Sequence, residues 1–132
     1  MTNIKLSSPR LTALFADVGG EQGLERVLLN FYEKMSRDLL IGFFFEGKDI
    51  KDIALKQKSF LMRAWGVTPS YQGKSPADAH KQLPRILSGH FDRRLVILAE
   101  TLREFGLNDE SIELWINFEK KFRQAVQDSS TQ

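Results

Sequence analysis

Apolar residues recur at helical spacing along two long stretches of this chain, and that period constrains the fold more than any other feature. Residues 21–37 place them at i, i+3, i+4 and i+7, the pattern of one helical face. Residues 50–65 carry a second stripe, in which Gln57 is the one strongly polar member. Runs of strict alternation are short, and the hairpin dipeptides Asn-Gly and Asp-Gly are absent. The pattern therefore predicts an all-α fold.

The same period and its capping signals place the other helices. A shorter leading helix begins at Ser8-Pro9 and stops at Gly19-Gly20. Two further helices are expected over residues 88–105 and from Asn108 or Asp109 to about residue 126. A short helix around residues 76–82 is expected to carry His80.

Two segments, residues 43–49 and 66–84, show no regular pattern and predict irregular structure. The segment 39–45 is apolar but too short for a long helix, and it predicts a buried corner. A helical domain with such long irregular segments usually needs a further component that orders them, and a buried ligand can be that component.

The amino-acid composition limits the classes of protein and of site that this chain can form. The 132 residues make one domain, 1–132, with a frayed tail over about 128–132. The absence of cysteine excludes disulfides, zinc–thiolate sites and thiol catalysis. Only two histidines, His80 and His90, are present, which argues against a multi-histidine metal site.

Charge and hydropathy argue against two classes of partner. The net charge of +2 comes from interspersed residues without a basic stripe, which argues against nucleic-acid binding. No stretch approaches the ~20 apolar residues that span a bilayer. The first residues also lack the apolar core of a signal peptide. We therefore expect a soluble, cytoplasmic protein without a membrane partner.

Several short motifs in a fixed order carry a family resemblance. They are Gly19-Gly20, Phe31-Tyr32, Phe44-Phe45, Gln57-Lys58-Ser59-Phe60-Leu61, Tyr71-Gln72-Gly73, Ala79-His80-Lys81-Gln82-Leu83 and His90-Phe91-Asp92. Tyr32 and Phe45 are 13 residues apart, and Lys56 and His80 are 24 apart. Together these features resemble the truncated (2/2) globins, closest to their group I pattern, over nearly the whole chain.

The resemblance implies a two-over-two helical sandwich around haem b. It makes His80 the proximal ligand of the iron, since a neutral imidazole is the axial base of globins. The alternative for His80 is a surface histidine at the end of a short helix.

On the opposite, distal side, the resemblance makes Tyr32 a hydrogen-bond donor to bound O2 and Gln57 a second donor. The alternative is that Tyr32 and Gln57 bond to each other or to backbone within the core. Phe45 corresponds to the phenylalanine that packs on the haem face. The remaining cofactor-binding candidates are Phe44, Phe60, Leu61, Trp65, Tyr71 and Phe91.

Lys56 stands where some members of the family supply a second, distal ligand to the iron. A lysine can do so only as the neutral amine, which requires a lowered pKa. The alternative, which we favour, is a lysine that extends along the pocket edge to a haem propionate. Lys58, Arg63 and Lys81 are lesser propionate candidates, each more typical of plain surface.

Three further positions bear on the site. His90 fits a helix-start residue better than a second ligand. Ile53 stands where the family often has a glutamine, which removes one distal donor. Arg94 falls near a position that usually lines the pocket with an apolar or tryptophan side chain, where it could bind a propionate or an anionic ligand.

Three functions follow from these residues. The first is a haem protein that binds O2 and NO, suited to oxygen transport or, with an external reductase, to NO dioxygenase activity. The second is a six-coordinate redox or peroxide-handling (peroxidase-like) haem protein with Lys56 on the iron. The third is a haem-free globin-fold module for sensing or interaction, which would leave the set of His80, Tyr32, Phe45 and Gln57 unexplained.

Overall fold

The computed structural model describes residues 9–68 and 85–129, in which the regular elements are all helices and no strand occurs. The elements are α1 (Pro9–Asp17), α2 (Gly20–Ser36), the 3₁₀ helix η1 (Gly42–Phe45), α3 (Ile50–Ala64), α5 (Ser88–Glu104), α6 (Asp109–Lys120) and α7 (Arg123–Ser129). The all-α prediction is confirmed.

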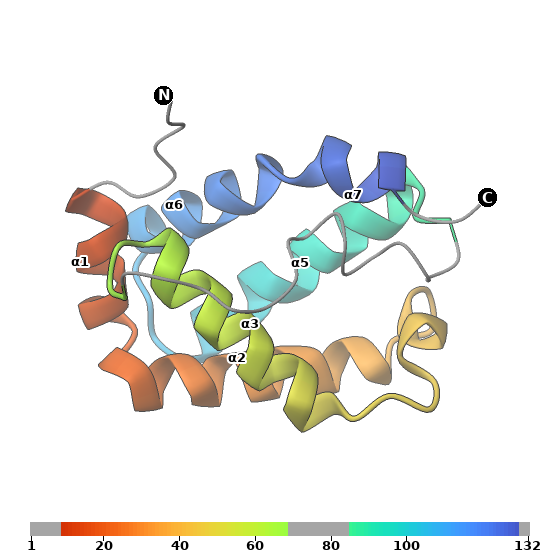
Figure 1. Ribbon diagram of the computed structural model, residues 1–132, viewed down its shortest axis with the longest axis horizontal. Helices are drawn as coiled ribbons and strands as arrows, with labels where there is room; N and C mark the ends of the chain where they lie inside the picture. The colour runs from red at the N-terminus through yellow and green to blue at the C-terminus, as the bar shows by residue number, and fades with distance from the viewer. Residues whose placement is uncertain (1–8, 69–84, 130–132) are drawn as a thin grey trace.

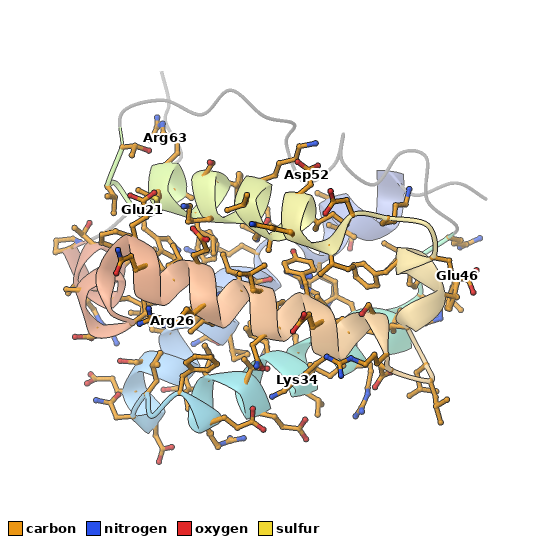
Figure 2. All side chains as sticks on the ribbon, turned by 90° about the horizontal axis from the view of Figure 1, so that it is seen from below. Glu21, Arg26, Lys34, Glu46, Asp52 and Arg63 are labelled. Carbon is orange, nitrogen blue, oxygen red and sulfur yellow. The ribbon has the colours of Figure 1, made fainter. Side chains whose placement is uncertain are left out.

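Helix α2 lies at the centre of the packing. It contacts α1, η1, α3 and α5, while α6 packs against α5 and α1 (Figure 1). Its buried face carries Leu24, Val27, Leu28, Phe31, Tyr32 and Met35, the stripe expected from the sequence. The opposite faces of the helices carry charge, as Arg26 on α2 and Asp52 and Arg63 on α3 illustrate (Figure 2). Two amphipathic pairs, α2 with α3 and α5 with α6, thus enclose the core.

The ends of the long helices follow the predicted signals. Gly19 and Gly20 adopt positive φ angles of 105° and 70°, which allow the sharp turn between α1 and α2. Asn108 caps α6, where its Oδ1 accepts a hydrogen bond of 2.8 Å from the Ser111 amide. Asp49 caps α3 in the same way through the Asp52 amide, at 3.1 Å.

The last helix differs from the prediction, because it is broken in two. The Lys121 and Phe122 amides donate to the carbonyls three residues back, which tightens the chain after α6. Phe122 is thereby placed against Phe118 and Phe60, with ring centroids 5.3 and 5.7 Å apart. Aromatic packing thus accompanies the break that the periodic pattern did not reveal.

Two predicted features lie partly or wholly outside the residues that the structure describes. The short helix expected over residues 76–82 lies outside the described residues. Helix α7 extends to Ser129, and residues 130–132 of the expected tail also lie outside them.

Gly23, in the first turn of α2, lies directly against the backbone that links α1 to α2. A Cβ at this position would lie 2.1 Å from the Val18 carbonyl oxygen. We expect Gly23→Ala to lower the free energy of unfolding by about 1–3 kcal/mol, the usual cost of overpacking. Gly89→Ala is the matched control, because a Cβ there meets nothing within 4 Å and α5 gains helix propensity. Urea unfolding of both variants checks this, and equal effects would contradict it.

Candidate functional site

A buried tyrosine and two phenylalanines form the part of the predicted site that the structure brings together. Tyr32 on α2 is 5% exposed, and its ring meets the Phe45 ring edge-on at 6.0 Å. Phe44 is buried in the same 3₁₀ turn, whereas Phe45 stays half-buried. Apolar rings therefore lie against a buried phenol near the corner between α2 and α3, and the guanidinium of Arg94 lies 5.7 Å from the centre of the same phenol ring.

Gln57 lies on the face of α3 that turns towards this interior. It stands three residues after Ala54 and four before Leu61, and both of these neighbours are fully buried. Gln57 itself is partly buried. An amide on an otherwise apolar helical face is thus available beside the core, as the stripe in the sequence indicated.

The other predicted wall residues that are described pack into the aromatic core. Trp65 ends α3 and meets the Trp115 ring edge-on at 4.9 Å. Phe91 is buried on α5, with the Arg123 guanidinium 4.7 Å from its ring centre. Phe60 is partly buried and contacts Phe122. In the described part of the chain their contacts tie α3 and α5 to α6 and α7.

The predicted proximal ligand His80 and the predicted pocket residue Tyr71 lie outside the described residues. Both therefore stay predictions from the sequence.

Lys56 and Lys58 are two residues apart but have different surroundings. Lys56 is exposed, with its Nζ 2.9 Å from Asp52 Oδ2 one turn earlier on α3. Lys58 is 13% exposed and donates to Glu21 and Glu25 of α2, at 2.9 Å each. Its ammonium is therefore engaged in tying α3 to α2, which differs from the propionate role considered for it.

The Lys58 ion pairs shift the pKa values of both kinds of partner. The hydrogen bond from Lys58 holds the pKa of Glu25 below its ordinary value. The hydrogen bond with Glu25 raises the pKa of Lys58; burial opposes this rise, and Glu21 adds to it. Both shifts favour the ionised pair over the neutral pH range.

His90 acts at the start of α5, as its position in the sequence indicated. Its Nδ1 accepts a hydrogen bond of 3.0 Å from the Leu87 amide. Its ring meets those of Phe44 and Phe43 edge-on at 5.2 and 5.7 Å. These contacts account for the residue without a ligand role.

Arg94 departs from the expectation of a propionate or anion contact. Its Nη2 and Nε donate to Glu119 Oε1 at 3.0 and 3.3 Å, so an internal carboxylate holds the guanidinium. Sequence analysis missed Glu119, although it shares the buried face of α6 with Ile112 and Trp115, seven and four residues earlier. An acidic residue on an apolar helical face was the available signal.

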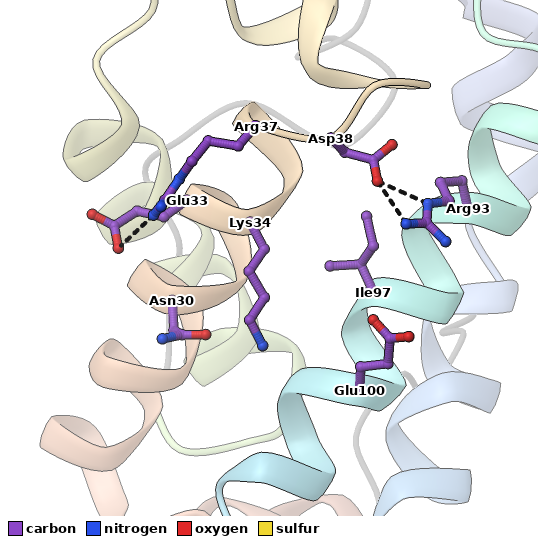
Figure 3. A pocket seen from close by; sticks show the side chains of 8 residues that line it. All are labelled: Asn30, Glu33, Lys34, Arg37, Asp38, Arg93, Ile97 and Glu100. Carbon is purple, nitrogen blue, oxygen red and sulfur yellow. Dashed lines mark hydrogen bonds and ion pairs between the residues drawn. The ribbon is translucent and has the colours of Figure 1, made fainter.

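A separate, polar hollow of about 410 Å³ opens between α2 and α5. Two ion pairs lie in its lining (Figure 3). Arg93 pairs with Asp38 at 2.7 Å, and Arg37 pairs with Glu33 at 3.8 Å. Its charged lining does not suit a planar apolar cofactor.

The described residues suit an organic cofactor better than a bare metal ion. Residues 9–68 and 85–129 contain no cluster of three His, Cys, Asp or Glu that could hold a metal. They do supply an interior of aromatic and aliphatic side chains, and its polar groups include the phenol of Tyr32, the amide of Gln57 and the paired Arg94 and Glu119. Apolar surfaces with a few hydrogen-bond donors fit the face of a haem. No helix among these residues has the length and hydropathy needed to cross a membrane.

Comparison with known proteins decides the family. Residues 13–128 match the family described as bacterial-like globin. The group 1 truncated hemoglobin GlbN of Synechocystis sp. is 33% identical over 105 residues, which cover 77% of this chain and 85% of that protein. The chain belongs to the group 1 truncated haemoglobins. The family binds small ligands at haem, and haem is the cofactor of this chain.

Two further relatives agree with this assignment. The group 1 truncated hemoglobin LI410 of Chlamydomonas moewusii is 35% identical over 76% of this chain, and the match spans only 59% of that longer relative. The crystal structure of the truncated hemoglobin from Tetrahymena pyriformis in its Fe(III) form superimposes with a TM-score of 0.77 at 28% identity. That match covers 90% of this chain and 98% of the other. The predicted two-over-two fold is confirmed.

The two lysines on α3 allow a matched test of the α2–α3 contact. We expect Lys58→Met to lower the midpoint of thermal unfolding more than Lys56→Met does, because Lys58 holds two carboxylates from a largely buried position. Since the pKa of Glu25 is lowered, its share of the stabilisation is complete above the ordinary value of 4.5 and is lost as the pH falls through the folded-state pKa. The gap between the Lys58→Met variant and the unmodified protein should therefore narrow in acid, and a gap that does not depend on pH would refute this.

Proposed function

We propose that this chain binds haem b through His80 and reversibly binds O2 and NO, with Tyr32 as the main hydrogen-bond donor to the ligand. The single observation that carries the proposal is the buried phenol of Tyr32 beside Phe45, within an apolar interior bordered by α3. A phenol in such a place donates a strong hydrogen bond, because no water competes for it.

When bound, haem supplies an open coordination position at which diatomic ligands bind. The chain's own residues then decide how long a ligand stays. Tyr32 donates to it from α2, and Gln57 offers a second N–H from α3. Phe44, Phe45 and Leu61 keep water away, which slows oxidation of the iron.

A neutral imidazole suits the proximal role of His80, because it supplies one nitrogen to the metal and keeps the other as a donor. A backbone carbonyl is the expected acceptor for that second nitrogen, and such a bond fixes the tautomer.

NO detoxification extends the same proposal. Conversion of NO and O2 to nitrate consumes one electron per turnover, so this activity needs an external reductase. A cytoplasmic setting is part of this proposal.

We further propose that Lys56 contacts a haem propionate and does not bind the iron. The Asp52 carboxylate lies 2.9 Å from its ammonium and favours the charged form, whereas coordination requires the neutral amine. The long aliphatic stem can reach along a pocket edge while the charge stays in water.

The absorption spectrum and ligand kinetics test the main proposal. We expect a Soret band when the protein is produced with haem, and His80→Ala should abolish the five-coordinate ferrous spectrum. Tyr32→Phe should speed O2 dissociation about tenfold to a hundredfold, which corresponds to the ~1–3 kcal/mol at stake in a buried hydrogen bond. The absence of a Soret band would refute the haem proposal, and an unchanged dissociation rate would refute the role of Tyr32.

A second spectrum tests Lys56. The ferric spectrum of Lys56→Met should match that of the unmodified protein in its coordination and spin state. Loss of a six-coordinate, low-spin spectrum in this variant would show instead that Lys56 is an iron ligand and would favour the redox function.

A further inference from the structure

Tyr32 adjoins a buried polar cluster that the proposed function does not use. The cluster, called here the Arg94 cluster, consists of Arg94 on α5 with Glu119 and Trp115 on α6, and it lies beside Tyr32 on α2. The side chain of Arg94 is 21% exposed and that of Glu119 is 7% exposed, while Trp115 is fully buried. Three helices thus bring one cation, one anion and two aromatic residues together beside the proposed ligand pocket.

Glu119 holds the guanidinium in one orientation. Its Oε1 accepts from Nη2 and Nε of Arg94, and its Oε2 accepts a bond of 3.2 Å from Trp115 Nε1. Both carboxylate oxygens therefore have donors. Because two guanidinium nitrogens meet the same oxygen, the planar group cannot turn without losing a charge-assisted bond.

Two aromatic rings confine the other sides of Arg94. Its Cζ lies 5.0 Å from the centre of the Phe31 ring and 5.7 Å from that of the Tyr32 ring. Burial lowers the pKa of Arg94, but the charge of Glu119 and its hydrogen bonds with the guanidinium act against burial, and the pKa is raised. The guanidinium therefore stays charged next to the phenol.

The chemistry of the two groups fixes the direction of a hydrogen bond between Arg94 and the Tyr32 hydroxyl. A guanidinium has five N–H donors and no acceptor, so a hydroxyl that meets it must accept. A phenol has a single proton to donate. When its oxygen accepts from Arg94, that proton is left for another acceptor, and accepting a bond also strengthens the donor character of the O–H group.

We propose that Arg94, held by Glu119, is a positioning residue that occupies the acceptor side of the Tyr32 hydroxyl and directs its proton towards a ligand in the pocket. This inference rests on the proposed function, because it assigns the role of Arg94 in the same site. It makes Arg94 a determinant of ligand residence that acts through Tyr32.

The alternative is that the Arg94–Glu119 pair only ties α5 to α6. A purely structural pair would change stability, and any effect on ligand binding would not depend on the Tyr32 hydroxyl. A double-mutant cycle separates the two roles, because it measures whether the effects of the two sites are coupled.

The cycle combines Arg94→Met/Glu119→Gln with Tyr32→Phe in the haem-loaded protein. Changing both charged residues leaves no unpaired buried charge, which favours folding. We expect the Arg94→Met/Glu119→Gln protein to release O2 about threefold to tenfold faster, the effect of one weakened hydrogen bond. The same pair of changes should have no effect once Tyr32→Phe has removed the hydroxyl.

The C–O stretching frequency of the ferrous carbonyl form gives a second readout that does not depend on turnover. Loss of the aligned donor should raise this frequency in Arg94→Met/Glu119→Gln and leave it unchanged when Tyr32→Phe is also present. Arg94→Lys is a further variant that keeps the positive charge but loses the planar guanidinium group. It should give an intermediate shift of the C–O frequency.

The neighbouring ion pair on the same helix is a matched control. Arg93 and Asp38 also join α5 to the region after α2, and Asp38 is 8% exposed, but their pair faces the polar hollow. Arg93→Met/Asp38→Asn should change stability while leaving O2 release and the C–O frequency unchanged.

The possible results separate failure of the role of Arg94 from failure of the proposed function. Equal effects with and without the Tyr32 hydroxyl, or no effect in either, would overturn the role of Arg94 while leaving the proposed function standing. An unmodified protein without a Soret band would overturn the proposed function itself. If Arg94→Met/Glu119→Gln does not fold, the same comparison made with Arg94→Lys decides between the positioning and structural roles.

Discussion

The burial of one helix on several sides is the constraint on which the rest of the structure depends. Helix α2 packs against α1, α3, α5 and η1, so its apolar stripe must match four neighbours at once. Gly23 lets its first turn lie against the end of α1, where a methyl group would not fit. The same stripe carries Tyr32, so the packing that holds the fold also places the phenol in the interior.

Polar groups inside this core carry a cost that only pairing offsets. An unpaired buried charge costs several kcal/mol. Here Arg94 and Glu119 form an ion pair, and the indole N–H of Trp115 donates a hydrogen bond to the second carboxylate oxygen of Glu119. A buried pair of this kind adds little net stability over an apolar replacement. Its main consequence is orientation, because Glu119 fixes the plane of the guanidinium beside the rings of Phe31 and Tyr32.

The helices could be predicted from the sequence because each depends on local spacing. The stripes of α2 and α3, the cap at Asn108 and the turn at Gly19 all follow from residues within a few positions of one another. The break before Arg123 could not, since it accompanies the packing of Phe122 against Phe60 on another helix. Gln57 stood out because it interrupts an apolar stripe. The interruption by Glu119 was missed, so the pairing of Glu119 with Arg94 was not predicted.

The sequence by itself determined the helical pattern and the order of motifs, because period and spacing are properties of the chain alone. The candidates Tyr32, Gln57 and His80 came from the family resemblance that those motifs carry. Only the tertiary structure decided which charges meet. Arg94 and Glu119 are 25 residues apart on different helices, and Lys58 meets Glu21 and Glu25 across a helix crossing. Such pairings depend on which faces the packing of apolar stripes brings together, and no local spacing encodes them.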